Sequence, residues 1–530
     1  MNAAMIGAVA MNEVRMRTRR VSSLVAVMIV VAITWMMVAD PATGKAMIVV
    51  NHARALYNST ALALGSSVLA SILLGLGSFY LVRGRTREDL RHGMGAILAT
   101  TPIGNMTFLF ARWLGSVAYL CTLMLVLMAT MMVLQLVRGD TPVEPLVFLQ
   151  MYGLILLPTI FFAASVAVLC DAFAPLMGKL GDVLYFLLWI GQFSAMPSAI
   201  EKKSEAMGWI ASIDVSGLAT MSHRLKQLFQ TDGLNIGNSR FDAALPPLLV
   251  TDFWTSEMAV TRLLCALVAL LPLLPAVLLF HRFSPDRVKA TSGSTGRIAA
   301  LFAFLNRMLR PVTMVVRPLL AISARVPGMA GQALADIALT LISSPIAVVA
   351  LPILMLAGSF ADMGGMGGKG GGLNGVLVAG IACWGILVSD LSVRDYQSAT
   401  EALTGVVPGG ARRRHVRHLA VAILLGFMFS AMVLLRWLVA NPFGALTLFT
   451  GIFALASIAA LLGRSTRTGR TFLALFLFGL YLSLQIRDVQ WFDVVGFNGA
   501  ATTASVGAQL LAGVIACTAG WLFIRRKANI

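Results

Sequence analysis

Two polar segments of this chain carry a hydroxyl, carboxylates and arginines at a spacing that suits helix capping and the docking of a charged partner. The first reads Thr86-Arg87-Glu88-Asp89-Leu90-Arg91, and the second reads Ser392-Val393-Arg394-Asp395-Tyr396. In each, the hydroxyl stands three residues before an aspartate, so both side chains could bind free backbone N–H groups in a helix's first turn. The spacing predicts short polar helices over 86–99 and 392–404.

The first of these segments is also amphipathic. Leu90, Met94, Ile97 and Leu98 fall on one helical face, and the charged side chains lie on the other. Two interpretations stay open for such a helix. It either lies on a membrane surface or docks into a soluble partner, once per segment.

Other residues that could do chemistry are sparse. The chain contains no Gly-x-x-x-x-Gly-Lys-[Ser/Thr] sequence, and its glycine run at 364–372 predicts a flexible loop. His415 and His418 stand among arginines, which disfavours a metal cation and favours contact with lipid headgroups or a role in topology. The five cysteines lie in apolar stretches and are interpreted as buried hydrophobic residues. We expect no catalytic residue, metal or cofactor in the chain itself.

The composition is that of a membrane protein. Of the 530 residues, 58% are hydrophobic and 12% are charged, whereas a soluble domain is about half apolar and a quarter charged. A water-soluble enzyme, a disordered scaffold and a disulfide-rich module are thereby excluded. We predict an all-α integral membrane protein with about twelve transmembrane helices, because a span needs roughly 20 apolar residues. The candidate segments are 21–39, 59–82, 108–136, 146–169, 181–199, 258–281, 342–360, 375–390, 418–439, 442–462, 471–486 and 504–524.

The placement of charge orients these helices. With a cytoplasmic N-terminus and alternating spans, the cytoplasmic segments hold 29 of the 41 lysines and arginines, as the positive-inside rule expects. The first apolar run is too long for a signal peptide, so we interpret it as an uncleaved helix. Both termini are predicted to be cytoplasmic. The net charge of +18 then reflects topology, and no nucleic acid partner is expected.

An internal repeat is suggested by the loops. Five residue pairs share one offset of 306: Thr86/Ser392, Asp89/Asp395, Ala96/Ala402, Pro102/Pro408 and Gly104/Gly410. An Asp-Val-x-Gly sequence also precedes the sixth and the twelfth candidate span, at 214–217 and 493–496. The pattern predicts two six-helix halves, 1–285 and 332–530, joined by a basic cytoplasmic linker at 286–331 that lies on the anionic inner surface.

Few charges occur inside the spans. Arg112, Arg262 and Arg436 lie near span ends, and we interpret them as anchors that extend toward the membrane surface. The longest outer segment, 199–257, mixes aromatic and charged residues and predicts short helices at the outer interface. Whether that segment is a packed lid or an exit gate stays open. The candidate gate residues are Asp214, Trp254 and Asp493.

With these features in order, the chain resembles the permeases of ABC-2 type transporters. The likeness rests on the basic segment 12–17, the polar helix that ends in Leu98-Ala99-Thr100-Thr101-Pro102, the third span that opens with Phe110-Ala111-Arg112-Trp113-Leu114-Gly115, and the junction at 167–186. In the second half, the junction at 462–470 is similar to a turn of that family that contains Gly-x-x-x-x-Arg. Such permeases usually have six spans and pair up, so twelve spans imply a fused pseudo-dimer.

The resemblance implies roles for the segments. The helices at 86–99 and 392–404 would be coupling helices that contact two copies of a separate ATPase, which holds ATP and Mg²⁺. The contact residues would be Arg87, Glu88, Asp89 and Arg91 in the first half and Arg394, Asp395 and Tyr396 in the second. Segments 3–20 and 326–341 would be connecting helices, and 199–257 and 486–503 the outer cap. The expected function is export of an amphipathic or hydrophobic peptide, drug or lipid-like molecule across a bacterial cytoplasmic membrane, in contact with its lipids.

Two other classes of membrane protein agree less well with the sequence. A twelve-span secondary carrier would usually keep a short turn rich in Gly and Asp after the second span, where this chain has an amphipathic segment. A membrane-embedded lipid or glycan enzyme would need clustered polar residues at one membrane face. The aspartates and the histidine of the outer segment show no recognisable spacing for that chemistry.

Overall fold

The computed structural model describes residues 3–91, 93–94, 97, 100–101, 103–202, 213–230, 233–251, 253–280, 314, 316–362, 372–398, 400–401, 410–486 and 489–528. The chain divides into two compact units, Met1–Ser294 and Thr295–Ile530. The division falls inside the segment 286–331 that the sequence assigns to a linker.

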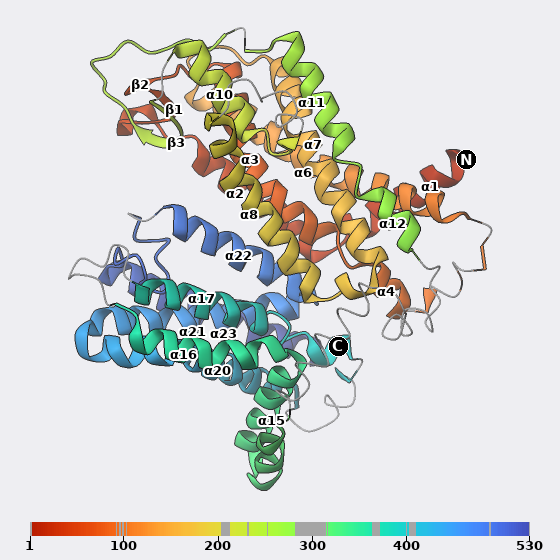
Figure 1. Ribbon diagram of the computed structural model, residues 1–530, viewed down its shortest axis with the longest axis vertical. Helices are drawn as coiled ribbons and strands as arrows, with labels where there is room; N and C mark the ends of the chain where they lie inside the picture. Colours follow the sequence, from red (N-terminus) through yellow and green to blue (C-terminus); the bar gives the residue numbers. More distant parts are fainter. Residues whose placement is uncertain are drawn as a thin grey trace. The chain divides into compact units, whose positions relative to one another are not determined.

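Unit 1 is a bundle of helices with one small sheet (Figure 1). Its elements are α1 (Ala3–Thr18), α2 (Val21–Met37), η1 (Pro41–Thr43), β1 (Lys45–Val50), β2 (Ala53–Arg54), α3 (Ser59–Val82), α4 (Arg85–Arg91), α6 (Asn105–Arg138), α7 (Pro145–Ala172), η2 (Ala174–Leu176), α8 (Lys179–Lys202), α10 (Leu218–Phe229), β3 (Leu234–Arg240), α11 (Ser256–Val268) and α12 (Leu273–Leu279).

Helix α3 forms the core of unit 1. Nearly all of its residues are buried, and it packs along α7 and also contacts α6 and α8. Its N-terminus is capped by Asn58, whose side chain accepts a hydrogen bond from the backbone N–H of Ala61 (2.8 Å). Helix α3 contains five serines, and three of them, Ser66, Ser67 and Ser71, donate their hydroxyls to carbonyls of their own helix.

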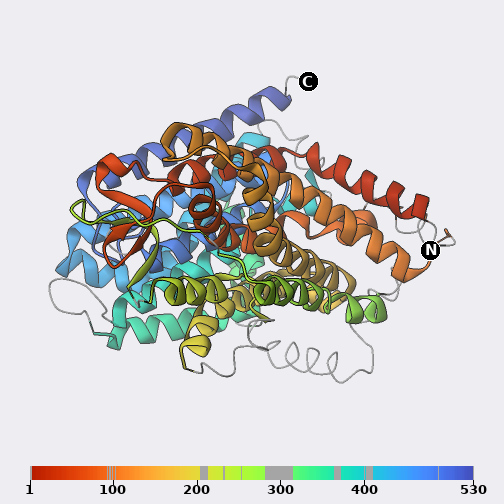
Figure 2. The same ribbon diagram turned by 90° about the horizontal axis from the view of Figure 1, so that it is seen from above.

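The sheet corrects the expectation that only short helices would lie outside the spans of the first half. Its antiparallel order is β2-β1-β3, with Val50 opposite Leu234 and Lys45 opposite Arg240 (Figures 1 and 2). A run of β-branched residues, Ile48 to Val50, favours the central strand. The strand ends at a tight turn in which Asn51 and His52 take positive φ angles.

Tyr57 attaches this sheet to the helices. Its hydroxyl accepts from the backbone N–H of Met47 (3.2 Å) and donates to the carbonyl of Ala39 (2.9 Å). Its own N–H donates to the carboxylate of Asp140 (2.8 Å). Burial raises the pKa of the Tyr57 phenol, so the hydroxyl keeps the proton that it donates.

Unit 2 is helical throughout its described elements. They are α15 (Gly328–Ser343), α16 (Pro345–Phe360), α17 (Gly372–Val388), α18 (Arg394–Gln397), α20 (Gly410–Ala440), α21 (Pro442–Thr466), α22 (Gly469–Gln485) and α23 (Thr503–Ala528). Helix α20 contacts α15, α16, α17 and α21, and α21 packs along α23. Trp384 of α17 is fully buried and donates its indole N–H to the carbonyl of Ala422 in α20 (2.8 Å).

All twelve predicted apolar segments lie in helices, but not all of these helices qualify as spans. Among the described residues, seven helices are long and apolar enough to cross a membrane. The number rises to nine if two bent pairs each count as one span: α1 with α2, bent by 74°, and α15 with α16, bent by 99°. Helices α17 and α22 have only 17 residues each, and a straight span needs about 20. The total of twelve spans stays a prediction.

Candidate functional site

Ten charged residues of unit 1 gather around the short helix α4. We call this group the first ionic cluster. It consists of Glu13 and Arg17 from α1, Arg20 at the bend before α2, Arg83 after α3, Arg85, Glu88 and Asp89 from α4, Arg112 from α6, Asp171 from α7 and Asp182 from α8. Five positive and five negative side chains balance, which buried charges require.

The N-terminus of α4 is capped by a residue far away in sequence. The carboxylate of Asp171 accepts from the backbone N–H groups of Gly84 (2.9 and 3.0 Å) and Arg85 (2.8 Å). The hydroxyl of Thr86 instead accepts from the guanidinium of Arg112 (3.1 Å), and Asp89 forms an ion pair with Arg112. The capping box predicted from Thr86 and Asp89 is therefore wrong, since an aspartate of α7 takes its place.

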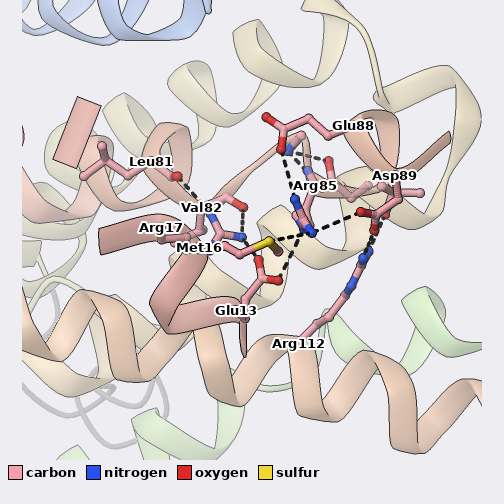
Figure 3. Close-up of polar contacts among 12 residues, drawn as sticks. Glu13, Met16, Arg17, Leu81, Val82, Arg85, Glu88, Asp89 and Arg112 are labelled. Atoms are coloured by element: carbon pink, nitrogen blue, oxygen red, sulfur yellow. Dashed lines mark hydrogen bonds and ion pairs between the residues drawn. The ribbon is translucent and has the colours of Figure 1, made fainter. Parts of the chain in front are cut away.

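Arg85 lies at the centre of the cluster (Figure 3). Its guanidinium lies 3.4 Å from Glu13, 3.2 Å from Glu88 and 3.2 Å from Asp89, measured between nitrogen and oxygen. Arg85 thereby links Glu13 of α1 to the partly exposed Glu88 and the buried Asp89 of α4. Charge-assisted contacts of this kind are stronger than neutral hydrogen bonds.

Arg17 attaches α1 to the end of α3. Its guanidinium donates to the carbonyls of Leu81 (3.0 Å) and Val82 (2.7 Å) and pairs with Glu13 (2.6 Å), as Figure 3 shows. The carbonyls in a helix's last turn have no partner within the helix, so Arg17 supplies one. Gly115 of α6 allows α1 to come this close, because a Cβ there would lie 2.7 Å from Cβ of Glu13.

Arg83 connects three further segments. Its guanidinium pairs with Asp182 of α8 (2.6 Å), lies 4.0 Å from Asp171 and donates to the carbonyl of Gly178 (3.0 Å). Nearby, the rings of Phe79 and Tyr185 stack with centroids 3.8 Å apart. The turn between α7 and α8 is thus attached to the end of α3.

The predicted coupling residues of the first segment differ in accessibility. Arg87 is exposed, Glu88 is partly exposed, and Asp89 is buried. The side chain of Arg91 and most of 92–99 lie outside the described residues. Within the predicted apolar face, Met94 and Ile97 are exposed. Among the described charged residues of this helix, the exposed Arg87 and the partly exposed Glu88 are therefore the ones that a partner can reach.

The second ionic cluster lies in unit 2. It consists of Asp336 from α15, Arg394 and Asp395 from α18, Glu401 between α18 and α20, Arg414, Arg417 and His418 from α20, and Arg464 from α21. Arg414 lies 3.5 Å from both Asp395 and Glu401, and Arg417 pairs with Asp336 (2.6 Å).

The helix predicted over 392–404 is shorter in the structure. Helix α18 covers Arg394–Gln397, and 402–409 lie outside the described residues. The hydroxyl of Ser392 donates to the carbonyl of Ala459 (3.3 Å) and does not cap α18. Tyr396 lies under Arg467, with 4.9 Å between the guanidinium carbon and the ring centroid.

Both Asp-Val-x-Gly sequences form buried turns. The carboxylate of Asp214 accepts from the N–H groups of Gly217 (3.0 Å) and Thr220 (2.9 Å) and from the hydroxyls of Ser216 and Thr220 (both 2.8 Å). In unit 2, the carboxylate of Asp493 accepts from the N–H groups of Asn498 (3.1 Å) and Ala500 (2.9 Å). Both aspartates are fully buried.

These turns also share a backbone conformation. Gly217 and Gly496 have φ angles of +74° and +82°, which favour glycine. The buried aspartates therefore hold these turns together, and their role in an outer gate stays a prediction. Trp254, the third predicted gate residue, donates its indole N–H to the sulfur of Met151 (3.2 Å) on the face of α7.

Arg262 of α11 is the most deeply buried arginine of the described residues, at 1% exposure. Helix α7 contains Pro158, which has no N–H to offer the carbonyl four residues earlier. Arg262 donates to that carbonyl, Leu154 (3.0 Å), and to the next one, Ile155 (3.1 Å). It also donates to the carbonyls of Asp214 (2.5 Å) and Val215 (3.3 Å).

The interpretation of the membrane arginines as anchors that extend to the surface is therefore wrong for Arg112 and Arg262. Arg262 binds the carbonyls before Pro158 in α7, Arg112 binds Asp89 and Thr86, and both are buried. Arg436 donates to the carbonyls of Gly358 (2.8 Å) and Ala361 (2.7 Å) at the end of α16. Each arginine satisfies polar groups of the protein.

Among the described residues, no group of three or more His, Cys, Asp or Glu side chains could hold a metal ion. The long apolar helices define the chain as a multi-pass helical membrane protein. No family model matches the chain, and no curated protein or solved structure matches it.

Proposed function

We propose that the chain is the membrane-spanning permease subunit of an ABC-2 type exporter, built as a fused pseudo-dimer that works with two separate ATPase subunits. The observation that carries the proposal is the short polar helix in each unit, held by ion pairs or a charged hydrogen bond to the first helix of the bent pair and to a long helix that follows. In unit 1 these are α4, α1 and α6, and in unit 2 they are α18, α15 and α20.

The order of elements supports a duplication. Each unit has a bent helix pair, a further helix, the short polar helix, two long helices of which the second begins with proline, and a fifth helix. The Asp-Val-x-Gly turn follows. Unit 2 then ends with α23, whereas unit 1 continues with α10, β3, α11 and α12. Helix contacts agree: α1 packs on α6 as α15 packs on α20, and α7 packs on α11 as α21 packs on α23. Two six-helix repeats explain this agreement better than chance does.

The ion pairs suggest how force would pass from an ATPase into the membrane. Helix α4 is bound to α1 through Glu13, to α6 through Arg112 and to α7 through Asp171. Movement of α4 by the partner would therefore carry the ends of three helices with it. ATP and Mg²⁺ would be held by the partner, and this chain would supply the path for cargo.

The apolar interior suits an amphipathic or hydrophobic cargo, such as a peptide, drug or lipid-like molecule. In unit 1, a cavity of about 20 Å³ lies between α3, α7 and α8. Its lining includes Tyr185, Trp189 and Phe193, with the amide of Gln192 among them. The cavity has room for about one water molecule, so the apolar helices, and not this cavity, support a hydrophobic cargo.

Replacing Arg87 tests the docking role. Arg87→Glu should weaken association with the ATPase and lower cargo-stimulated ATP hydrolysis at least tenfold, because an exposed contact charge is reversed. The melting temperature of the permease should stay unchanged, since Arg87 is exposed. Pull-down and hydrolysis assays on the reconstituted complex measure both effects. The matched control is Arg240→Glu on β3, which is equally exposed. Full association and full stimulation in Arg87→Glu would refute docking and favour a helix that only lies on the membrane.

Cysteine labelling tests the proposed orientation in a bacterial cytoplasmic membrane with both termini inside. A cysteine at Arg240 should react with an impermeant maleimide in intact cells. Cysteines at Arg87 and Arg413, which are also exposed, should react only after permeabilisation. The native cysteines are replaced beforehand, and denatured protein gives the full labelling signal. Labelling of position 413 in intact cells would reverse the orientation.

A further inference from the structure

The second ionic cluster holds more positive charge than its carboxylates neutralise. Asp336 pairs with Arg417 (2.6 Å), and Asp395 and Glu401 both lie against Arg414, so three carboxylates face four arginines. Within the described residues, no carboxylate lies within 4 Å of Arg394 or Arg464. Arg394 instead donates to the hydroxyl of Thr340 (2.8 Å), which carries no charge.

Four side-chain nitrogens of this cluster are buried without a hydrogen-bond partner in the described part of the chain: Nη1 of Arg394, Nε of Arg464, Nδ1 of His418 and Nε of Arg417. Nε of Arg417 lies 2.6 Å from the carboxylate of Asp336, so the other three are left to be explained. His418 is only 4% exposed. The adjoining segment 402–409 contains no acidic residue, so it has no carboxylate to offer. A buried polar group without a partner costs on the order of 1–3 kcal/mol, and more if it is charged.

The first ionic cluster shows that the surplus is particular to unit 2. In the first ionic cluster, each of the five arginines lies within 4 Å of at least one carboxylate. Arg464 lies in the last turn of α21 and is partly exposed, so an ion can reach it. Asp395 and Glu401 act on Arg464 only from a distance, and both already lie against Arg414.

We propose that Arg394, Arg464 and His418 form a binding site for a phosphate group. Guanidinium groups match the oxygens of a phosphate in shape and charge, and a phosphate accepts several hydrogen bonds at once. The group can belong to an anionic phospholipid headgroup or to free phosphate. A lipid fits the surroundings, because Arg412 at the start of α20 is exposed and lies 5.1 Å from the ring of Trp521, a pairing common at membrane interfaces.

Thermal unfolding and native mass spectrometry of the purified full-length chain in neutral detergent test the site. Phosphatidylglycerol should raise the melting temperature by several degrees and appear as a bound mass, whereas phosphatidylcholine should do neither. Arg464→Gln should abolish the rise and the bound mass. The control, Arg413→Gln, removes the same charge from an exposed position on α20 and should keep both.

The remaining measurements distinguish a phospholipid headgroup from free phosphate as the source of the bound group. Stabilisation by inorganic phosphate that disappears in Arg464→Gln supports the site and identifies a free anion as its ligand. An equal response of Arg464→Gln and the unmodified chain to both probes, or no response of the unmodified chain, overturns the proposal. If Arg464→Gln does not fold, Arg464→Lys replaces it, because this variant keeps the positive charge. The expected outcome is then that Arg464→Lys binds less lipid than the control Arg413→Gln. No ATPase enters these measurements, so they are independent of the proposed transport function.

Discussion

Asp89→Ala should lower the free energy of unfolding by about 3–5 kcal/mol, the cost of removing one partner of a buried ion pair. Asp89 is buried and pairs with Arg112, which is itself 7% exposed, and with Arg85 (3.2 Å). Without the carboxylate, Arg112 loses its closest ion pair and keeps the hydroxyl of Thr86 and a cation–π contact with Phe108 among its neighbours. The melting temperature and the yield of monodisperse protein from detergent extracts measure the loss.

Two comparison variants make this result specific. Glu88→Gln should cost only about 0–1 kcal/mol, because Glu88 is partly exposed and its ion pairs are screened by water. Asp89→Leu combined with Arg112→Leu should recover much of the stability, since an apolar pair leaves no unpaired charge. A melting temperature of Asp89→Ala equal to that of the unmodified chain would show that the first ionic cluster does not hold α4.

Arg262→Leu should destabilise unit 1 by at least about 3 kcal/mol, because four buried carbonyls lose a charged donor. These carbonyls belong to Leu154, Ile155, Asp214 and Val215. Leu263→Ala, one position along α11 and 58% exposed, serves as the control and should have little effect in detergent.

A second substitution tests the reason for this loss. Pro158→Ala restores a backbone N–H for the carbonyl of Leu154, so the double variant Arg262→Leu with Pro158→Ala should recover about 1 kcal/mol relative to Arg262→Leu. In the presence of Arg262, Pro158→Ala should bring no such gain. Strict additivity of the two substitutions would contradict the role assigned to Arg262. Differential scanning fluorimetry of the four proteins provides the cycle.

The helices could be predicted from the sequence because membrane spans depend on local composition. A run such as 59–82 is apolar over its whole length, and the hydrocarbon thickness fixes the length required. The helix boundaries at Pro145 and Pro442 also follow from local chemistry, since proline suits the first turn. The number of spans could not be fixed in this way, because 17-residue helices such as α17 fall at the limit of crossing.

The ion pairs could not be predicted, because they join residues that are far apart in sequence. The carboxylate of Asp171 caps α4 at Gly84, 87 positions earlier in the chain, and Arg83 pairs with Asp182, 99 positions later. The sequence instead offered Thr86 as a local cap for α4, but the hydroxyl of Thr86 binds Arg112. A usable signal was present: Glu13, Arg83, Asp171 and Asp182 are charges at the ends of apolar runs, where opposite signs tend to meet. The partner of Arg262 was signalled by Pro158, whose missing N–H demands a donor.

The contact between Arg262 and the carbonyls before Pro158 in α7 has a consequence for how the chain is made. The carbonyls of Leu154 and Ile155 are synthesised 108 and 107 residues before the side chain that satisfies them. At about 5–20 residues per second, a bacterial-to-eukaryotic range of elongation rates, α7 waits on the order of 5–20 s for its partner. Unsatisfied carbonyls are costly in hydrocarbon, so during that interval α7 must stay beside water or the insertion machinery. Unit 1 can therefore close only after α11 has left the ribosome, about halfway through translation.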